Sequence, residues 1–300
     1  MKKSHSPRKI LVGVDFSGGS SQALLEAGRI AAEGKAAIHA LHIIDEAILN
    51  DLREYSHLED AEVVSSFEKR LKVFCAEAGL SGKKISRNVQ IGHPVKAFSS
   101  LCDEIEPDLL VLGAWCEYLT DAEVMGVTAR HIMQESKSDV LLMRDREKDR
   151  VQRVVACVDF SDYDSAVVRV AESVCHADRA SLDILHVFFP PWISEFSVDK
   201  VIDEAFEDRK REYRALLQGR LDQLVPHPRN SGEAIEVQTV VRECTRHCEG
   251  ILSYLKKCDA DLAVIGARGR SRIESMILGR IAERIVMNSR SSVYVVKNPL

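Results

Sequence analysis

The chain has 300 residues, 45% of them hydrophobic, and a formal net charge of −5 at pH 7. This length exceeds what one hydrophobic core usually holds and suits two domains of about 150 residues each. The small, mixed charge excludes a basic field that would attract nucleic acid or an anionic membrane surface. No apolar run approaches the roughly 18 residues of a membrane helix, and the N-terminus lacks the features of a signal peptide, so we expect a cytoplasmic protein.

The sequence contains an internal repeat, which is the first feature to interpret in a chain of this length. The matched segments are VDFS at 14–17 and 158–161, LHI at 41–43 and LHV at 185–187, and PDLLVLGAW at 107–115 and ADLAVIGAR at 260–268. The first two pairs are offset by 144 residues and the third by 153. The second half therefore carries nine extra residues between its second strand and residue 260. We predict two domains, residues 1–146 and 151–300, with the charged run at 144–150 as the linker.

Within each half, apolar runs of strand length alternate with segments of helical periodicity. The predicted strands of the first half are 9–15, 36–44, 84–91, 108–113 and 139–144, and those of the second half begin at 153, 183, 234, 261 and 292. The long charged helices predicted at 50–78 and 199–225 present solvated faces and pack an apolar stripe on the core. This alternation predicts parallel βαβ units with right-handed crossovers. Each half is then a doubly wound α/β domain with a five-stranded parallel sheet flanked by helices.

In an open parallel sheet, ligands bind beyond the carboxyl ends of the strands. In the second half, Asp159, Val187 and Gly266 occupy these positions. Gly266 would let a ligand approach the backbone, Gly269 would supply a positive φ, and Gly279 would open a helix whose free N–H groups favour phosphate. The cations and hydroxyl between these glycines, which suit a polyphosphate, are Arg268, Arg270, Ser271 and Arg272.

On these motifs the chain resembles a tandem universal stress protein, whose nucleotide-binding members carry G-x2-G-x9-G followed by Ser or Thr. The resemblance implies two Rossmann-like domains (adenine nucleotide alpha hydrolase-like), ATP or ADP with or without Mg²⁺, and a role in stress regulation. It also implies that the two halves of the chain pack against each other through their final strands. A further pairing into a homodimer and an unidentified protein partner are expected as well. By the resemblance Asp159 and Val187 line the adenine and ribose, and the phosphates lie along Gly266, Arg268, Gly269, Arg270 and Gly279.

Two departures from the family pattern affect this interpretation. Arg280 stands where the family has Ser or Thr; it either binds phosphate, points to solvent or fills the pocket. In the first half, Gly113 and Gly126 are kept, but the residues that replace the rest of the motif are Trp115, Cys116, Glu117, Asp121, Glu123 and Val127. Because carboxylates repel a polyphosphate, we predict that the first half has lost nucleotide binding and is a structural or regulatory partner.

Several alternatives remain open from the sequence. Asp15 and Asp159, like Ser17 and Ser161, are also typical helix caps. Cys244, His247 and Cys248 fall at i, i+3 and i+4, and with Cys258 and His176 they form a candidate zinc site, against thiols that pack or sense oxidants. The eight cysteines predict buried thiols in a reducing compartment. The segment at 188–196 is either an apolar lid, an interface or a loop packed over the sheet edge.

The rival to nucleotide binding is a binding or scaffold protein of the same fold that holds an apolar ligand or acts through its thiols. Enzymatic turnover has little support, because the chain has no Walker-type Gly-Lys-Ser/Thr motif and no nucleophilic serine elbow. The sequence therefore predicts at most slow ATP hydrolysis.

Overall fold

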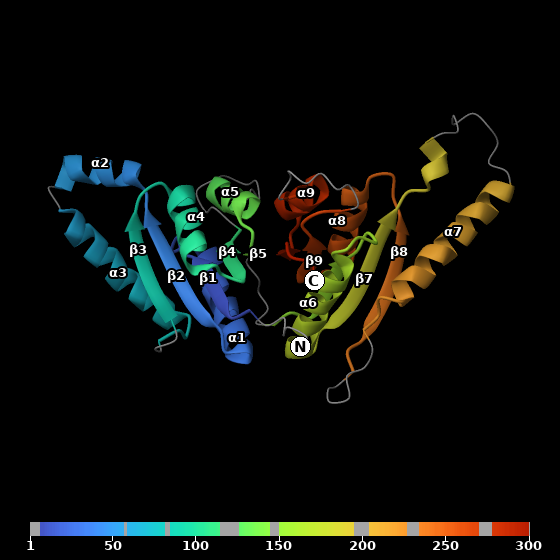
Figure 1. Ribbon diagram of the computed structural model, residues 1–300, viewed down its shortest axis with the longest axis horizontal. Coiled ribbons are helices and arrows are strands. Elements are labelled where there is room, and N and C mark those ends of the chain that lie inside the picture. The colour runs from blue at the N-terminus through green and yellow to red at the C-terminus, as the bar shows by residue number, and fades with distance from the viewer. Residues whose placement is uncertain are drawn as a thin grey trace. The chain divides into compact units, whose positions relative to one another are not determined.

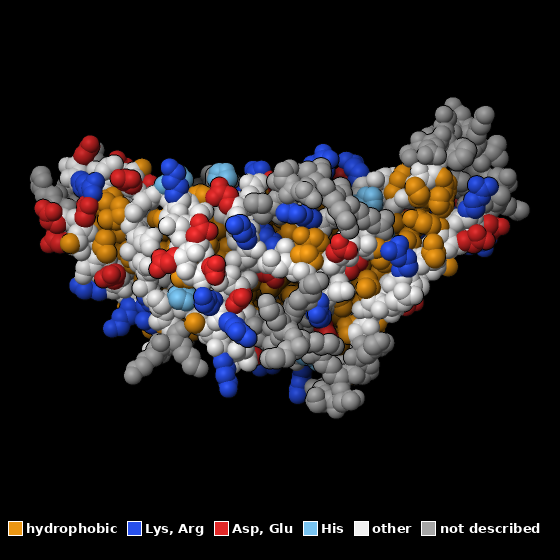
Figure 2. All heavy atoms as spheres, in the orientation of Figure 1, with side chains coloured by type: hydrophobic (Ala, Val, Ile, Leu, Met, Phe, Trp, Pro, Cys, Tyr) orange, Lys and Arg blue, Asp and Glu red, His pale blue; other side chains and the backbone are white. Residues whose placement is uncertain are grey.

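The structure is a computed structural model that describes residues 7–56, 59–81, 85–114, 126–144, 150–194, 204–226, 234–269 and 278–299. The chain divides into two compact units, unit 1 spanning Met1–Glu147 and unit 2 spanning Lys148–Leu300. Both are α/β units with parallel strands and flanking helices (Figure 1). On the face drawn in Figure 2, acidic and basic side chains are interspersed over each unit.

Unit 1 has a parallel sheet with the strand order β3-β2-β1-β4-β5 among its described residues. Its elements are β1 Lys9–Gly13, α1 Gly18–Gly34, β2 Ala37–Ile44, α2 Glu46–Ser56, α3 Asp60–Glu77, β3 Ile85–Ile91, α4 Pro94–Ile105, β4 Leu109–Gly113, α5 Val127–Glu135 and β5 Asp139–Met143. The first strand lies at the centre, so that its buried apolar run is covered on both faces, as is typical of parallel sheets.

Unit 2 repeats this topology with the strand order β8-β7-β6-β9-β10. Its elements are β6 Arg153–Cys157, α6 Asp164–Asp178, β7 Ser181–Phe188, the 3-10 helix η1 Pro191–Ser194, α7 Glu204–Asp222, β8 Val237–Glu243, α8 His247–Lys257, β9 Leu262–Gly266, α9 Arg280–Asn288 and β10 Ser292–Val296. The predicted fold class, two doubly wound α/β domains with five parallel strands each, is confirmed.

The cores of both sheets form from the apolar runs that identified the strands. Ile10, Leu11 and Val12 of β1 are completely buried, as are Val154 and Val155 of β6. Burying such a side chain fully contributes about 1.5–3 kcal/mol, so the two central strands anchor their units. No helix in the described part of the chain combines the length and apolar character that a membrane crossing requires.

The first charged helix differs from its prediction. The single helix expected at 50–78 is two helices, α2 and α3, and α3 begins at Asp60 after the N-cap residue Glu59. The backbone N–H of Glu59 donates to the Glu62 carboxylate at 3.2 Å, which forms one side of a capping box. Two acidic residues thus start a new helix inside a stretch whose periodicity alone looked continuous.

The segment after β7 begins by packing against α7. The Trp192 ring of η1 lies 5.1 Å from the ring of Tyr213, which in turn lies 5.8 Å from Phe188. These contacts favour the interpretation of 188–196 as a packed loop for its described part. Residues 195 and 196 lie outside the described residues.

Candidate functional site

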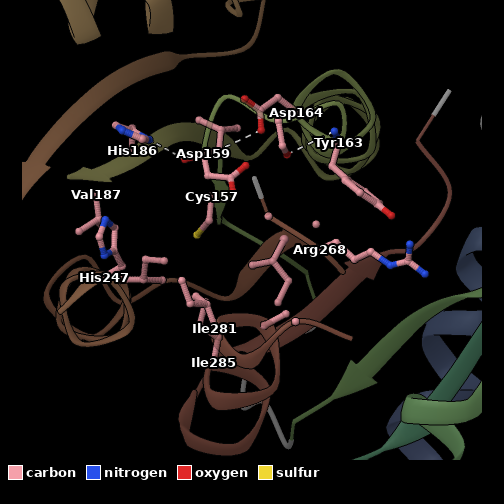
Figure 3. A pocket seen from close by; sticks show the side chains of 18 of the residues that line it. Cys157, Asp159, Tyr163, Asp164, His186, Val187, His247, Arg268, Ile281 and Ile285 are labelled. Atoms are coloured by element: carbon pink, nitrogen blue, oxygen red, sulfur yellow. Dashed lines mark hydrogen bonds between the residues drawn. The ribbon is translucent and has the colours of Figure 1, made fainter. Parts of the chain in front are cut away.

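A cavity of about 440 Å³ opens in unit 2 beyond the carboxyl ends of β6, β7 and β9 (Figure 3). It lies where ligands bind in open parallel sheets, and its volume is typical of small-molecule sites. The predicted binding residues that line it are Asp159, Val187, Gly266, Arg268, Gly269, Gly279 and Arg280. The eighth predicted residue, Arg270, lies outside the described residues, together with Ser271 and Arg272.

One side of the cavity is apolar and aromatic. Val187 and Phe188 from β7, Tyr213 from α7, and His247 and Ile251 from α8 line this side. Figure 3 shows Val187 and the His247 ring together, on the opposite side of the cavity from Arg268. Flat rings and a branched aliphatic side chain suit the face of a planar, apolar group.

The other side of the cavity is formed by β9, the loop after it and the first turn of α9. Arg268 is half-buried there and Arg280 is exposed, and both line the cavity. Gly279 is the N-cap residue of α9 and its N–H donates to Ala267 O at 2.6 Å. Two arginines therefore belong to the cavity lining next to the N-terminus of α9.

The structure gives the glycines other roles than we predicted. A Cβ on Gly266 would lie 2.9 Å from the Cβ of Tyr163, so this glycine permits α6 to pack against the end of β9. Gly269 does not have a positive φ. A Cβ at Gly269 would instead lie 2.6 Å from Oδ2 of Asp159. Gly266 is thus required by a close contact near the backbone of Tyr163, an added side chain at Gly269 would displace the end of the Asp159 side chain, and the predicted positive φ was wrong.

An aromatic clamp holds the loop after β6 and was missed by the sequence analysis. Phe160 adopts φ 62°, which is uncommon for a bulky residue. Its ring lies 4.3 Å from the ring of His186, whose Nδ1 is 2.8 Å from the carbonyl oxygen of Val158. The Arg220 guanidinium covers the ring at 3.9 Å. The clamp fixes the residue next to Asp159.

Unit 1 contains the same clamp. Phe16 has φ 64°, its ring lies 4.4 Å from that of His42, and Arg70 covers it at 4.1 Å. Nδ1 of His42 is 2.8 Å from the carbonyl oxygen of Val14. Burial, the largest cause, lowers the pKa of His42. The repeated VDFS and LH segments were the signal that could have revealed this clamp.

Asp164 is a second carboxylate in the cavity lining that the sequence analysis missed. Its side chain is buried, and its Oδ1 accepts the backbone N–H of Asp159 at 3.2 Å. Burial raises the pKa of Asp164 to about 6, the backbone N–H of Asp159 opposes this and the charge of Asp159 adds to it. No motif marks Asp164, because the repeat has Ser20 at the matching position.

Helix capping by the two VDFS segments follows the prediction in unit 1 only. The Ser17 hydroxyl caps α1 by accepting the N–H of Ser20 at 3.2 Å, and Asp15 supports Ser17 without capping the helix itself. In unit 2 the N-cap residue is Tyr163, so Ser161 and Asp159 do not cap α6. The capping alternative for Asp159 was therefore wrong.

The candidate zinc ligands do not share a helical face. Cys244 follows β8 and precedes α8, which begins at His247, and Cys248 is buried in that helix. Within the described ranges, no group of three His, Cys, Asp or Glu residues could hold a metal ion. The geometric reason for a metal site at these residues was wrong, because the segment bends before the helix begins.

Six of the seven described thiols are poor candidates for oxidant sensing. Burial raises the pKa of Cys157, which lines the cavity, to about 12, and it does the same for Cys102 and Cys175. Burial also raises the pKa values of Cys75, Cys248 and Cys258. Since the thiolate is the reactive form, these six thiols are held in their less reactive state.

The first-half loop cannot be compared atom by atom. Trp115, Cys116, Glu117, Asp121 and Glu123 lie outside the described residues. Gly113 is placed, and a Cβ on it would lie 2.7 Å from the backbone carbon of Gly19. Gly126 is the N-cap residue of α5, as Gly279 is of α9.

The fold is that of two parallel α/β units, and the second unit has a cavity beyond the carboxyl ends of its strands. The sequence model of the universal stress protein family matches residues 7–144 and 150–297, so the chain belongs to this family. The chain is 41% identical over 49 residues to a universal stress protein of Methanocaldococcus jannaschii, a segment that makes up 16% of this chain and 29% of that protein. The chain thus spans less than a third of that curated relative.

Solved structures of similar fold cover almost the whole chain. A functionally unknown protein from Pseudomonas aeruginosa is 17% identical, with a TM-score of 0.65 over 98% of this chain and 94% of that one. A universal stress protein from Archaeoglobus fulgidus is 20% identical, with a TM-score of 0.61 over 97% and 98% of the two chains. A universal stress protein solved in complex with cAMP is 23% identical over 47% of this chain and 99% of that one, with a TM-score of 0.37.

Proposed function

We propose that unit 2 binds ATP or ADP in the cavity beyond β6, β7 and β9, and that the chain is a cytoplasmic regulatory protein of the stress response. The observation that carries this proposal is the two-sided cavity, with aromatic and apolar groups on one side and cations beside a helix N-terminus on the other. A nucleotide has the same polarity, from a flat base to a charged phosphate chain. The family membership supports the proposal.

The apolar side would hold the base and the ribose. Val187 and Ile251 pack against a flat ring, and Tyr213 and His247 enclose it from α7 and α8. Asp159, near the centre of the cavity lining, presents a carboxylate that accepts hydrogen bonds from ribose hydroxyl groups. This placement agrees with the role that the family resemblance gives to Asp159 and Val187.

The cationic side would hold the phosphates. Arg268 and Arg280 present planar guanidinium groups that bind phosphate oxygens in bidentate fashion. The first turn of α9 adds N–H groups without partners inside the helix, together with the positive end of its dipole. Arg280 thus replaces a hydroxyl by a cation at the start of this helix. A Mg²⁺ ion would be held mainly by the phosphates and water, as is usual for nucleotide-bound Mg²⁺.

Titration calorimetry at pH 7.5 tests this function with Mg-ATP, ADP, cAMP and adenosine. We expect ATP or ADP to bind and R268A and R280A each to weaken binding about ten- to a hundredfold, the loss of one charge-assisted hydrogen bond. R209A is the matched control, because Arg209 is exposed on α7 and does not line the cavity. Absence of adenine nucleotide binding at 1 mM ligand would refute the proposal.

R268A and R280A also distinguish nucleotide binding from the rival function, which is the binding of an apolar ligand. An apolar ligand would use the Val187 side of the cavity, so its binding would not change in R268A or R280A. Native mass spectrometry of the freshly purified chain distinguishes a nucleotide mass from a lipid mass. We also expect a homodimer and an unidentified protein partner whose binding depends on nucleotide, through the segment 267–278. Sedimentation with and without ATP checks the first of these expectations.

A further inference from the structure

The loop after the first strand uses its aspartate differently in the two units. In unit 1, Oδ1 of Asp15 accepts the N–H of Ser17 at 3.0 Å and the Ser17 hydroxyl at 2.5 Å. The Ser17 oxygen in turn accepts the N–H of Ser20 and caps α1. The Asp15 carboxylate is thus engaged in holding its own loop.

In unit 2 a different carboxylate holds the loop. Asp164 occupies the position of Ser20, and its Oδ1 accepts the N–H of Asp159, as Figure 3 shows. The backbone N–H groups of Phe160 and Ser161 also bond to this carboxylate. Ser161 no longer caps the helix, since its oxygen accepts the N–H of Tyr163 at 3.4 Å. Consequently α6 begins two residues later than α1 relative to the repeat.

The Asp159 carboxylate points toward the loop after β9. A Cβ added to Gly269 in that loop would lie 2.6 Å from Oδ2 of Asp159. Asp159, Asp164 and Gly269 all line the cavity. The carboxylate that turns back onto its own loop in unit 1 therefore reaches the ligand side of the cavity in unit 2.

We propose that Asp164 is a positioning residue that holds the backbone of 159–161 and thereby keeps the Asp159 carboxylate directed into the nucleotide cavity. The proposal rests on the proposed function for its effect on binding, but the orientation of Asp159 can be measured without any ligand. Asp164 is buried in the cavity lining, its carboxylate accepts the backbone N–H of Asp159, and it acts through Asp159.

This arrangement couples the cavity to pH. Only the ionised carboxyl accepts several N–H groups with both oxygens, because protonation converts one oxygen into a donor. Burial, and next the nearby Asp159 charge, raise the pKa of Asp164 to about 6, so its anchoring form predominates at pH 7.5 and is lost on acidification. Besides Asp164, the charged or titratable residues that line the same cavity are Cys157, Asp159, Tyr163, His186, Tyr213, His247, Arg268 and Arg280.

The affinity change follows from the ionised fraction of Asp164. With a pKa of about 6, about a tenth of the carboxyls are ionised at pH 5, so the apparent affinity falls about tenfold relative to pH 7.5. ADP titration at pH 5 to 8 in the wild type, D164N and D164S measures this. Both variants lack the titrating group, and D164S restores the residue of unit 1. The ratio of wild-type to variant affinity cancels the titration of ADP and of the other cavity groups.

We expect D164S to bind ADP about tenfold more weakly than the wild type at pH 7.5 and with equal affinity at pH 5. D164N should lie between them and show no step near pH 6. S20A in unit 1 is the control and should bind as the wild type does at every pH. Equal affinities of D164S and wild type at pH 7.5, or the same affinity ratio at every pH, would overturn the proposal.

Crystal structures of wild type and D164S without nucleotide supply the second measurement. In D164S the Asp159 carboxylate should turn to the N–H and hydroxyl of Ser161, as Asp15 does to Ser17. An unchanged Asp159 orientation would overturn the positioning role even if the chain bound no nucleotide. Failure of the wild type to bind ADP at pH 7.5, with the turned Asp159 in D164S, would refute the function and keep the positioning role.

Discussion

Unit 1 and unit 2 hold the loop after their first strands with the same aromatic clamp, yet they differ in the groups that face a ligand. Phe16 and Phe160 both adopt positive φ, and each ring contacts a histidine ring in a tilted arrangement and is covered by an arginine. The features that the units share are therefore those that the fold requires. The features in which they differ, such as Ser20 against Asp164, lie at the proposed site of unit 2.

The glycines after the fourth strand show the same division. Gly113 and Gly266 are both required because the first turn of a helix packs onto them, through Gly19 in unit 1 and Tyr163 in unit 2. Retention of Gly113 in the degenerate half is thus no sign of a remaining nucleotide site. Of the three spaced glycines, Gly269 is the one whose contact is with a cavity carboxylate.

The largest expected effect comes from the buried charge of Asp164. Its pKa is about 6 in the folded chain, against an ordinary value of 3.8, so the stability that it contributes is present below pH 3.8 and is lost as pH rises through 6. A shift of about two units corresponds to about 3 kcal/mol. As the pH rises from 4 to 8, the free energy of unfolding of D164S should therefore increase by about 2–3 kcal/mol relative to that of the wild type.

Urea unfolding of the full chain, measured from pH 4 to pH 8, checks this difference. S20A is again the control, because its profile should run parallel to that of the wild type. A D164S profile parallel to the wild type would mean that Asp164 carries no charge penalty. Asp164 would then direct Asp159 without lowering the stability of unit 2.

The sequence predicted the fold almost completely, because apolar strand runs and the internal repeat determine element order in a parallel α/β sheet. It also predicted that Asp159, Val187 and Gly266, which lie at or near the carboxyl ends of their strands, meet at one edge of the sheet, and all three line the cavity. It could not predict why the glycines are needed. Close approach of Tyr163 to Gly266 depends on where α6 begins, and no local pattern specifies that start.

The aromatic clamp and Asp164 escaped sequence reasoning for different reasons. Each clamp joins residues far apart in sequence, and Arg70 and Arg220 come from charged helices whose exposed cations look interchangeable. Asp164 resembles an ordinary acidic residue in a first helical turn, which is a common stabilising position. Its burial and its hydrogen bond to the backbone of Asp159 distinguish it.

The glycine substitutions are expected to have the next largest effect. G113A would bring a Cβ within 2.7 Å of the backbone of Gly19, and G266A within 2.9 Å of Tyr163. Such overpacking typically destabilises by about 1–3 kcal/mol, and G113A should be the worse because backbone cannot rotate away. Thermal and urea unfolding of the full chain measure both variants.

Gly219 provides a control of opposite sign. It lies in α7 with nothing within 4 Å of an added Cβ, so G219A should stabilise by about 0.5–1 kcal/mol, as alanine does over glycine inside a helix. If G113A proved neutral while G266A destabilised, the shared structural requirement would be wrong. The need for glycine at this position would then be specific to unit 2.

The smallest expected effect tests whether the clamp serves the fold alone or also the site. R70A and R220A each remove one cation over a phenylalanine ring, a contact that contributes about 0.5–1 kcal/mol. Both variants should lose about that much stability. R220A should also weaken ADP binding by up to about fivefold, because Phe160 is the neighbour of Asp159 and a looser loop lowers the fraction of chains with Asp159 in place. R70A should leave ADP affinity unchanged, since its clamp holds Asp15 in the unit without the proposed site. Equal losses of ADP affinity in R70A and R220A would show that the clamp of unit 1 affects binding as much as the clamp of unit 2 does.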